Sequence, residues 1–293
     1  MGTGFFPVRA RPLTVAALLT VYATSGCGGK TTDDSGMTAQ GGTGGTAGVG
    51  IPGIDGHAGS AGACSGAGGP MMVRLPEGYC IDSTEVTRGQ YQAWVATNPP
   101  TSGQPARCTW KTNFVPEETE CMTSTYVYHG SGFEDHPQVC VDWCDAYAYC
   151  QGVGKRLCGK IGGGPGSFDD YANPSSSQWH NACVSGAANN AYPYGNTYQP
   201  TVCAGYDYDP TITVPTASLP DCQSPVPGYA GIYDLSGNVW EWEDGCGGPG
   251  GTDLCRLRGG SFGWKSPYLR CDGVLYDKVS YATSGIGFRC CSP

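Results

Sequence analysis

Residues 231–242, which read GIYDLSGNVWEW, decide the fold of this chain. Five more blocks flank them in order: IDSTEVTRGQY at 81–91, HPQVCVDW at 136–143, YPYGN at 192–196, LRGGSF at 257–262 and GFRC at 287–290. Gly, Pro and Asn are the residues that turns require, and large aromatic side chains supply a core. The blocks therefore mark a single folded unit, which we place at residues 71–293.

Local patterns predict two helices within this unit. Thr87 and Gln90 have the spacing of a capping box, so a helix is expected to begin there. Asp142 is a typical N-cap for a second helix, which Gly152 or Gly154 is expected to end. Residues 72–81 indicate a short strand, and the chain beyond 155 indicates loops and short strands. The expected class is α+β.

Composition excludes several classes of protein. The chain has 293 residues, 39% of them hydrophobic, which is enough for a core. A formal charge of −9 argues against a nucleic-acid partner, since phosphate binding needs an excess of Lys and Arg. Seventeen cysteines are hard to keep reduced, so an oxidising compartment outside the cytoplasm is expected.

The N-terminal region predicts export and attachment to a membrane. Residues 13–23, LTVAALLTVYA, are apolar and too short to span a bilayer, which favours a signal peptide over 1–26. The following TSGC at 24–27 resembles a bacterial lipobox, so Cys27 is the expected lipid anchor. The alternative is an ordinary secretory signal with Cys27 incidental. With the lipid anchor, the protein is expected in the bacterial cell envelope, facing the periplasm or the exterior.

Residues 27–70 are expected to be a flexible tether. Positions 28–70 hold 16 glycines and no Phe, Trp or Tyr, so they cannot bury enough apolar surface to offset the cost of ordering. His57 and Cys64 are interpreted as incidental residues within this tether.

The six blocks, in this order, resemble the formylglycine-generating enzyme (sulfatase-modifying factor) family. This resemblance covers nearly all of residues 71–293 and implies a C-type-lectin-like, loop-rich α+β fold. The family's namesake oxidises a sulfatase cysteine with a copper(I) ion held by two cysteines just after the Gly-Gly-Ser-aromatic motif. The matching stretch here, FGWKSPYLR at 262–270, contains no cysteine, so copper is not expected.

The cysteines are expected to form disulfides. If Cys27 carries lipid, sixteen remain, enough for eight bridges. The resemblance implies two bridges, and proximity in the sequence suggests three local ones. The implied pairs are Cys150–Cys290 and Cys183–Cys271, and the local pairs are Cys108–Cys121, Cys203–Cys222 and Cys246–Cys255. The alternative is that adjacent Cys290 and Cys291, or Cys140 and Cys144, form a relocated metal site.

The resemblance also implies a structural calcium ion. Its expected ligands are the side chains of Asp234 and Glu241 and the backbone carbonyls of Gly237 and Val239, since Ca²⁺ prefers oxygen ligands. The alternative is that Glu241 only hydrogen-bonds a neighbouring loop.

Two functions follow as hypotheses. The first is a lipid-anchored module without catalytic residues that binds a protein, peptide or glycan through its loops. The alternative is a metal-dependent oxidase of the formylglycine-generating type, acting on a protein cysteine with a relocated metal site. The first predicts no reduced thiols in the folded unit, and the second predicts a close reduced pair.

Overall fold

Two sheets of four strands each form the frame of the part of the chain that the structure describes. The computed structural model describes residues 64, 68–116, 121 and 132–293. In chain order the elements are β1 (Met72–Arg74), β2 (Cys80–Asp82), α1 (Arg88–Val95), η1 (Ala106–Cys108), α3 (Trp143–Gly152), β3 (Arg156–Leu157), α4 (Gln178–Val184), η2 (Gly186–Ala188), β4 (Trp240–Cys246), β5 (Leu254–Arg258), η3 (Ser266–Tyr268), β6 (Val274–Lys278), β7 (Ile286–Phe288) and β8 (Cys290–Ser292).

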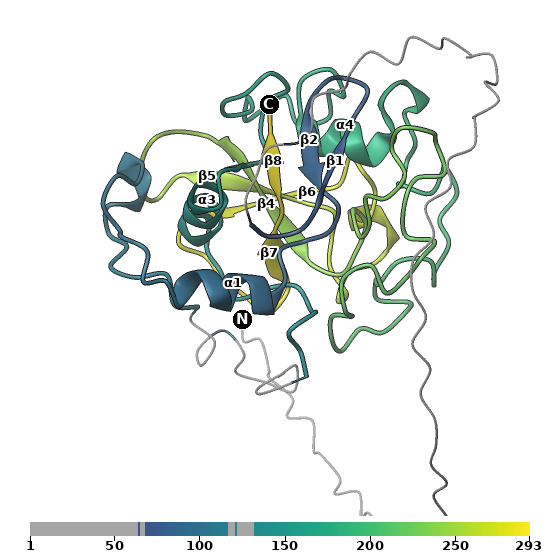
Figure 1. The fold of residues 1–293 in the computed structure, drawn as a ribbon. Helices are drawn as coiled ribbons and strands as arrows, with labels where there is room; N and C mark the ends of the chain where they lie inside the picture. Colours follow the sequence, from purple (N-terminus) through teal and green to yellow (C-terminus); the bar gives the residue numbers. More distant parts are fainter. Residues whose placement is uncertain (1–63, 65–67, 117–120, 122–131) are drawn as a thin grey trace, which may run out of the picture. The chain divides into compact units, whose positions relative to one another are not determined.

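The two sheets are joined through the last strands of the chain. The first has the order β1-β2-β8-β3, with every pair antiparallel. The second has the order β6-β5-β4-β7, in which only β4 and β7 run parallel. Consecutive strands β7 and β8 belong to different sheets, so Arg289, the residue between them, lies where the sheets meet (Figure 1).

The two helices expected from the sequence are present. The Thr87 side chain accepts from the Gln90 amide at the start of α1, and the Asp142 side chain accepts from the Asp145 amide at the start of α3. Helix α4 was not predicted. All seven of its residues, polar and apolar alike, are buried, so its sequence shows no alternation between an apolar buried face and a polar exposed face.

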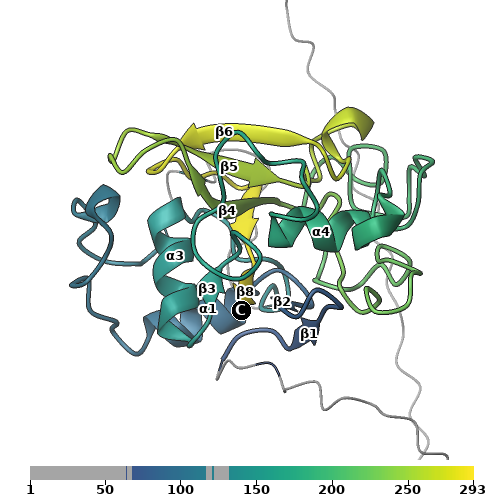
Figure 2. The same ribbon diagram turned by 90° about the horizontal axis from the view of Figure 1, so that it is seen from above.

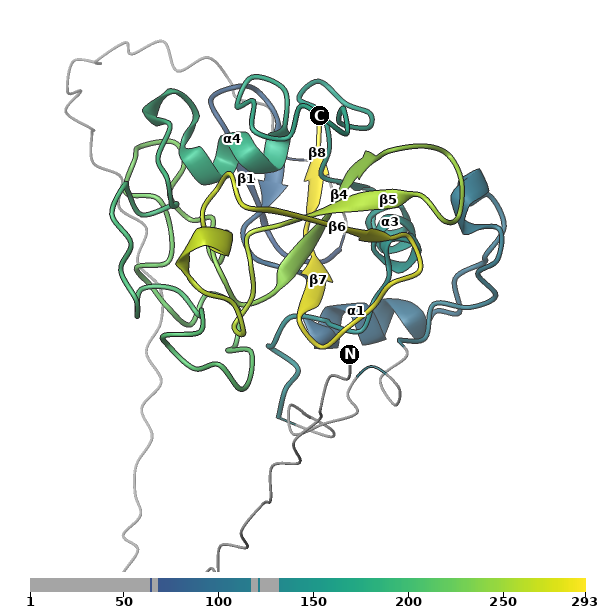
Figure 3. The same cartoon turned by 180° about the vertical axis from the view of Figure 1, so that it is seen from behind.

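The helices α3 and α4 pack on the same face of the strands β4–β6, at opposite ends (Figures 2 and 3). Around α1 and α3, the rings of Tyr91, Tyr149 and Phe288 pack with centroids 5.4–6.1 Å apart. A second cluster, which includes Trp179 and Leu235, lies at α4. The core is thus divided between the two ends of the sheet.

Eight disulfides join the sixteen cysteines that the structure describes. The two pairs that the family resemblance implies are present, as are two of the three local pairs. The bridges are Cys64–Cys80, Cys108–Cys144, Cys121–Cys140, Cys150–Cys290, Cys158–Cys291, Cys183–Cys271, Cys203–Cys222 and Cys246–Cys255.

The predicted pair Cys108–Cys121 was wrong. The short helix η1 places buried Cys108 beside Cys144 on α3, and Cys121 bonds to Cys140 instead. Proximity in the sequence therefore did not correspond to proximity in the fold.

Cys64 was also misinterpreted, because it bonds to Cys80 on β2 and is not incidental. The backbone oxygen of Pro70, the last residue assigned to the tether, accepts from buried Lys155 Nζ at 2.7 Å. Ordered structure therefore extends upstream of residue 71.

Cys27, His57 and residues 1–63 as a whole lie outside the described residues, as do 65–67, 117–120 and 122–131. Among the helices that the structure does describe, none combines the length and apolar character needed to cross a membrane.

Candidate functional site

The block at 231–242 forms a tight turn that leads into β4. Asp234, Gly237 and Asn238 have φ angles of 61°, 82° and 56°, in the left-handed region that Gly, Asn and Asp tolerate best. A Cβ on Gly237 would lie 2.4 Å from the carbonyl oxygen of Ala204, so only glycine fits there. Val239, which follows, is fully buried. The backbone conformation of the turn therefore determines which residues the block carries at these positions.

Glu241 on β4 forms a buried ion pair with Arg289. Arg289 donates from Nε to Oε2 and from Nη2 to Oε1 of Glu241, both at 2.7 Å. Trp179 Nε1 donates to Oε2 at 2.9 Å. The guanidinium also donates to the backbone oxygens of Asp82 and Tyr233. Both carboxylate oxygens of Glu241 therefore already have donors.

A calcium ion at Glu241 would therefore have to use the lone pair that these donors leave free on Oε1. Ca²⁺ takes six to eight oxygen ligands. Within the described residues, no group of three or more His, Cys, Asp or Glu side chains is placed to hold a metal. Asp234 keeps one carboxylate oxygen, Oδ1, without a described partner, while its Oδ2 accepts from the Ala217 amide at 2.7 Å. Calcium binding at this turn stays a prediction.

A second buried carboxyl group, Glu85, lies close enough to Asp234 for their charges to interact. Asn238 Nδ2 donates to Glu85 Oε1 at 3.0 Å, and Oε2 has no partner in the described part of the chain. Burial, reinforced by the negative charge of Asp234, raises the pKa of Glu85 well above its usual range. Burial also raises the pKa of Asp234, to about 6. Burial and the charge of Asp234 therefore both favour the protonated form of Glu85.

The stretch 262–270 carries aromatic and aliphatic side chains where the family's copper-binding cysteines are expected. The Trp264 and Tyr268 rings lie 4.5 Å apart, edge to face, and Trp264 also contacts Trp240 at 5.6 Å. Leu269 is buried, and its side chain fills the space beside Gly205. No thiolate ligand for a soft metal is available in this stretch.

The cysteines considered for a relocated metal site are also unavailable as ligands, because each is bonded in a disulfide. Cys290 and Cys291 point to opposite sides of β8, as neighbours on a strand do, and bond to Cys150 and Cys158. Cys140 and Cys144 are likewise bonded to other cysteines. None of the sixteen described cysteines is a free thiol.

A cavity of about 500 Å³ lies beside α3, and sequence reasoning missed it. Lys111 Nζ lies 2.8 Å from Asp142 Oδ2 and 2.6 Å from Asp145 Oδ1, and all three side chains are buried. Trp110 and Tyr281, each 43% exposed, are also part of the lining. We name it the Lys111 cavity. The sequence analysis recognised Asp142 as a helix cap. No sequence pattern indicated that Lys111 forms an ion pair with it.

Other acidic and histidine side chains in the described part of the chain make local contacts. Asp207 accepts from Tyr198, Asp209 accepts from Thr211, and Asp170 accepts from Asn173 and Ser176. The Nδ1 atom of His136 lies 2.9 Å from Thr213 Oγ1, and that of His180 lies 3.1 Å from Arg258 Nη2. His129 lies outside the described residues. None of these contacts joins two carboxylates in an acid–base pair.

Comparison with known proteins identifies relatives. Residues 43–292 match the family model described as "Sulfatase-modifying factor enzyme 1-like domain". The chain is 29% identical over 182 residues to the formylglycine-generating enzyme of Bos taurus, covering 53% of this chain and 44% of that protein. It is 30% identical over 176 residues to the inactive C-alpha-formylglycine-generating enzyme 2 of Mus musculus, covering 56% and 52%. The chain spans about half the length of these curated relatives.

Among solved structures, that of CarF covers 78% of this chain and 96% of its own, with 20% identity and a TM-score of 0.47. The family match and the disulfide-linked α+β architecture confirm the fold and the resemblance that the sequence blocks indicate.

Substitution of Glu241 tests whether the ion pair or a calcium ion stabilises the turn. We expect Glu241→Gln to lower the free energy of unfolding by about 3–5 kcal/mol, because it leaves Arg289 buried without a counter-charge. Urea unfolding with and without EDTA measures both effects. The ion pair predicts the same loss in both conditions, whereas a calcium ligand predicts that EDTA destabilises only the unmutated protein.

The buried Asp145 predicts a decrease of stability with rising pH. Burial, together with the nearby Asp142, raises its pKa to about 8 despite Lys111, against about 3.9 in an unfolded chain. The folded state therefore holds a proton that the unfolded state releases, and this contribution is lost as the pH rises through 8. The free energy of unfolding is expected to fall between pH 5 and pH 9, and more gently in Asp145→Asn. Identical slopes in the two proteins would contradict the raised pKa.

Proposed function

Because the chain belongs to the sulfatase-modifying factor enzyme 1-like family, we propose that it is a non-catalytic member that binds a ligand in the bacterial cell envelope. The observation that carries this proposal is the stretch 262–270, which holds Trp264, Tyr268 and Leu269 and no cysteine. A relative named as inactive matches the chain as well as a named enzyme does, which supports the proposal.

The disulfides support the same conclusion. Copper(I) prefers soft thiolate ligands, so an oxidase of the formylglycine-generating type needs a close, reduced cysteine pair. All sixteen described cysteines are in disulfides, and Cys27 is the proposed lipid attachment site. No specific observation favours the oxidase.

The proposed binding face consists of Tyr206, Tyr208 and Tyr268, which we call the tyrosine surface. These side chains are 43%, 41% and 44% exposed. The Tyr206 amide donates to the Trp264 carbonyl at 2.9 Å, which ties the two loops together, and Lys265 Nζ lies 4.6 Å from the Tyr206 ring. Rigid aromatic side chains on loops give large contact areas at low entropic cost. A protein, peptide or glycan is the proposed partner.

An activity assay tests the absence of catalysis. The full chain is treated with copper(I) and incubated under oxygen with a cysteine peptide of sulfatase sequence. We expect no aldehyde by mass spectrometry, whereas a copper-loaded formylglycine-generating enzyme, as the control, converts the peptide. Copper-dependent conversion by this chain would overturn the proposal.

A binding screen tests the tyrosine surface. Peptide and glycan arrays probed with the full chain are expected to give ligands whose binding Tyr268→Ala weakens at least tenfold. Tyr281→Ala removes an equally exposed tyrosine from the Lys111 cavity and is the matched control. Equal effects of the two substitutions would contradict a role for this surface.

Attachment to the envelope is tested at Cys27. We propose that a lipid on Cys27 and the segment that joins it to Cys64 hold the folded unit near the membrane. Expressed in a bacterium, the unmutated chain is expected in the membrane fraction, labelled by a palmitate analogue. Cys27→Ala is expected to be unlabelled and released. Unchanged fractionation of Cys27→Ala would contradict lipid anchoring.

A further inference from the structure

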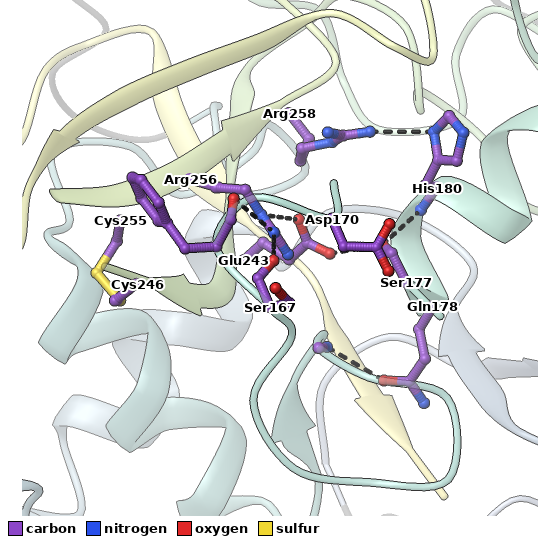
Figure 4. A network of polar contacts seen from close by, with 12 residues as sticks. Ser167, Asp170, Ser177, Gln178, His180, Glu243, Cys246, Cys255, Arg256 and Arg258 are labelled. Atoms are coloured by element: carbon purple, nitrogen blue, oxygen red, sulfur yellow. Dashed lines mark hydrogen bonds and ion pairs between the residues drawn. A yellow bond between two sulfur atoms is a disulfide. The ribbon is translucent and has the colours of Figure 1, made fainter. Parts of the chain in front are cut away.

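The disulfide Cys246–Cys255 joins the neighbouring strands β4 and β5, close to Glu243 and Arg256 (Figure 4). Cys246 is the last residue of β4, and it lies opposite Cys255 in the register of the sheet. The two cysteines are 9 residues apart in the sequence, the smallest separation among the eight described bridges. A bridge over a short loop restricts the unfolded chain little, so opening this one costs the fold the least stability.

Other contacts hold β4 and β5 together on both sides of this bridge. Towards the loop, the Gly247 amide donates to the Leu254 carbonyl at 2.9 Å. Towards the centre of the sheet, Arg256 Nε donates to Glu243 Oε2 at 3.0 Å, in an ion pair that is fully buried. The two strands are therefore expected to stay paired when the bridge is open.

The two sulfur atoms of the bridge differ in their access to solvent. Cys246 is half-buried, whereas Cys255 is fully buried. The loop that follows Cys246 reads GGPGGT at 247–252, so it has few side chains that could cover the sulfur. By contrast, both cysteines are buried in five of the eight described bridges. Cys246 is therefore the sulfur that a thiol from outside can approach.

Arg107 contacts the buried sulfur of the same bridge. Its Nη1 atom donates to Cys255 Sγ at 3.6 Å, and its guanidinium group lies 4.9 Å from the Trp143 ring, which holds it in place. The charge of Arg107 also acts on the Asp244 carboxyl, but no carboxylate in the described ranges forms an ion pair with Arg107. A nearby cation stabilises a thiolate, and a thiol of lower pKa leaves a disulfide faster. Cys255 is therefore the better leaving group.

We propose that Cys246–Cys255 is a site of thiol exchange, at which a thiol from outside the protein becomes bonded to Cys246. The incoming thiolate forms a bond to Cys246 Sγ, the S–S bond breaks, and its electron pair leaves with Cys255 Sγ as a thiolate beside Arg107. If the donor carries a second thiol, that thiol attacks the mixed disulfide and releases Cys246. The donor is then oxidised to a disulfide, and two electrons and two protons pass to the cysteine pair. This site is separate from the tyrosine surface and stands whether or not that surface binds a ligand.

Mapping of the bridges that open in the native protein tests the site. The folded full chain is incubated with reduced glutathione or with reduced thioredoxin at equal thiol concentration, quenched with acid, alkylated and analysed by mass spectrometry. We expect the first bridge to open to be Cys246–Cys255, with glutathione on Cys246 and an alkylated Cys255. Cys203–Cys222, a local bridge with both cysteines buried, is the internal control and should stay closed.

The two reagents distinguish the possible sources of the thiol. Faster opening by thioredoxin assigns a protein dithiol, and faster opening by glutathione assigns a small thiol. The proposal is overturned if another bridge opens first, if glutathione is found on Cys255, or if no bridge opens while the protein is folded.

Variants of Arg107 test the role of its charge. Arg107→Gln is expected to slow the opening of the bridge about tenfold, because the Cys255 thiolate loses its cation. Arg107→Lys keeps a positive charge and is expected to retain most of the rate. Arg270→Gln removes an arginine that pairs with Asp272 on the surface, and this control should change nothing. Urea unfolding of each oxidised variant checks the fold. Equal rates in Arg107→Gln and Arg107→Lys would contradict the proposed mechanism.

Discussion

The buried pair of Arg289 and Glu241 is the interaction on which the rest of the structure depends. Arg289 lies between β7 and β8, so a single guanidinium group reaches the carboxylate on β4, the backbone oxygen of Asp82 on β2 and the backbone oxygen of Tyr233. Trp179 from α4 completes the contact on the carboxylate. This single ion pair therefore makes contacts with both sheets, with helix α4 and with the loop at Tyr233. Breaking a buried pair of this kind leaves an uncompensated charge, which is far more costly than losing a surface ion pair.

Disulfides and short strands support this centre in a domain with little regular structure. The pairs Cys150–Cys290 and Cys158–Cys291 bind the last strand to α3 and to the chain just after β3, on the two sides of β8. Bridges that close long loops reduce the freedom of the unfolded chain most, and these two close 140 and 133 residues. These two bridges therefore fix the last strand independently of the loop at 262–270, whose residues take no part in them. At 262–270, where the family resemblance implies a metal-binding cysteine pair, this chain carries Trp264 and Tyr268 and no cysteine.

The sequence predicted those features whose cause is local. The capping residues at Thr87 and Asp142 placed two helices, because a cap is recognised over four residues. The glycine and asparagine of the 231–242 block indicated a turn, because only such residues adopt its left-handed backbone. Family resemblance supplied two long-range disulfides. What failed depended on contacts that no local pattern records: α4 is buried on every side, Cys64 and Cys108 bond to Cys80 and Cys144, and Lys111 contacts Asp145 on α3. Arg289 was part of the recognised block at 287–290, but the sequence around it did not indicate that it pairs with Glu241.

A map of free thiols in the mature full chain tests the non-catalytic function most directly. The secreted protein is alkylated in its native state and again after unfolding without reductant, and each modified cysteine is identified by mass spectrometry. We expect no alkylated cysteine between Cys64 and Cys291, because all sixteen are paired. Two alkylated cysteines close together in the fold, protected by copper(I), would contradict a non-catalytic function and identify the ligands of an oxidase.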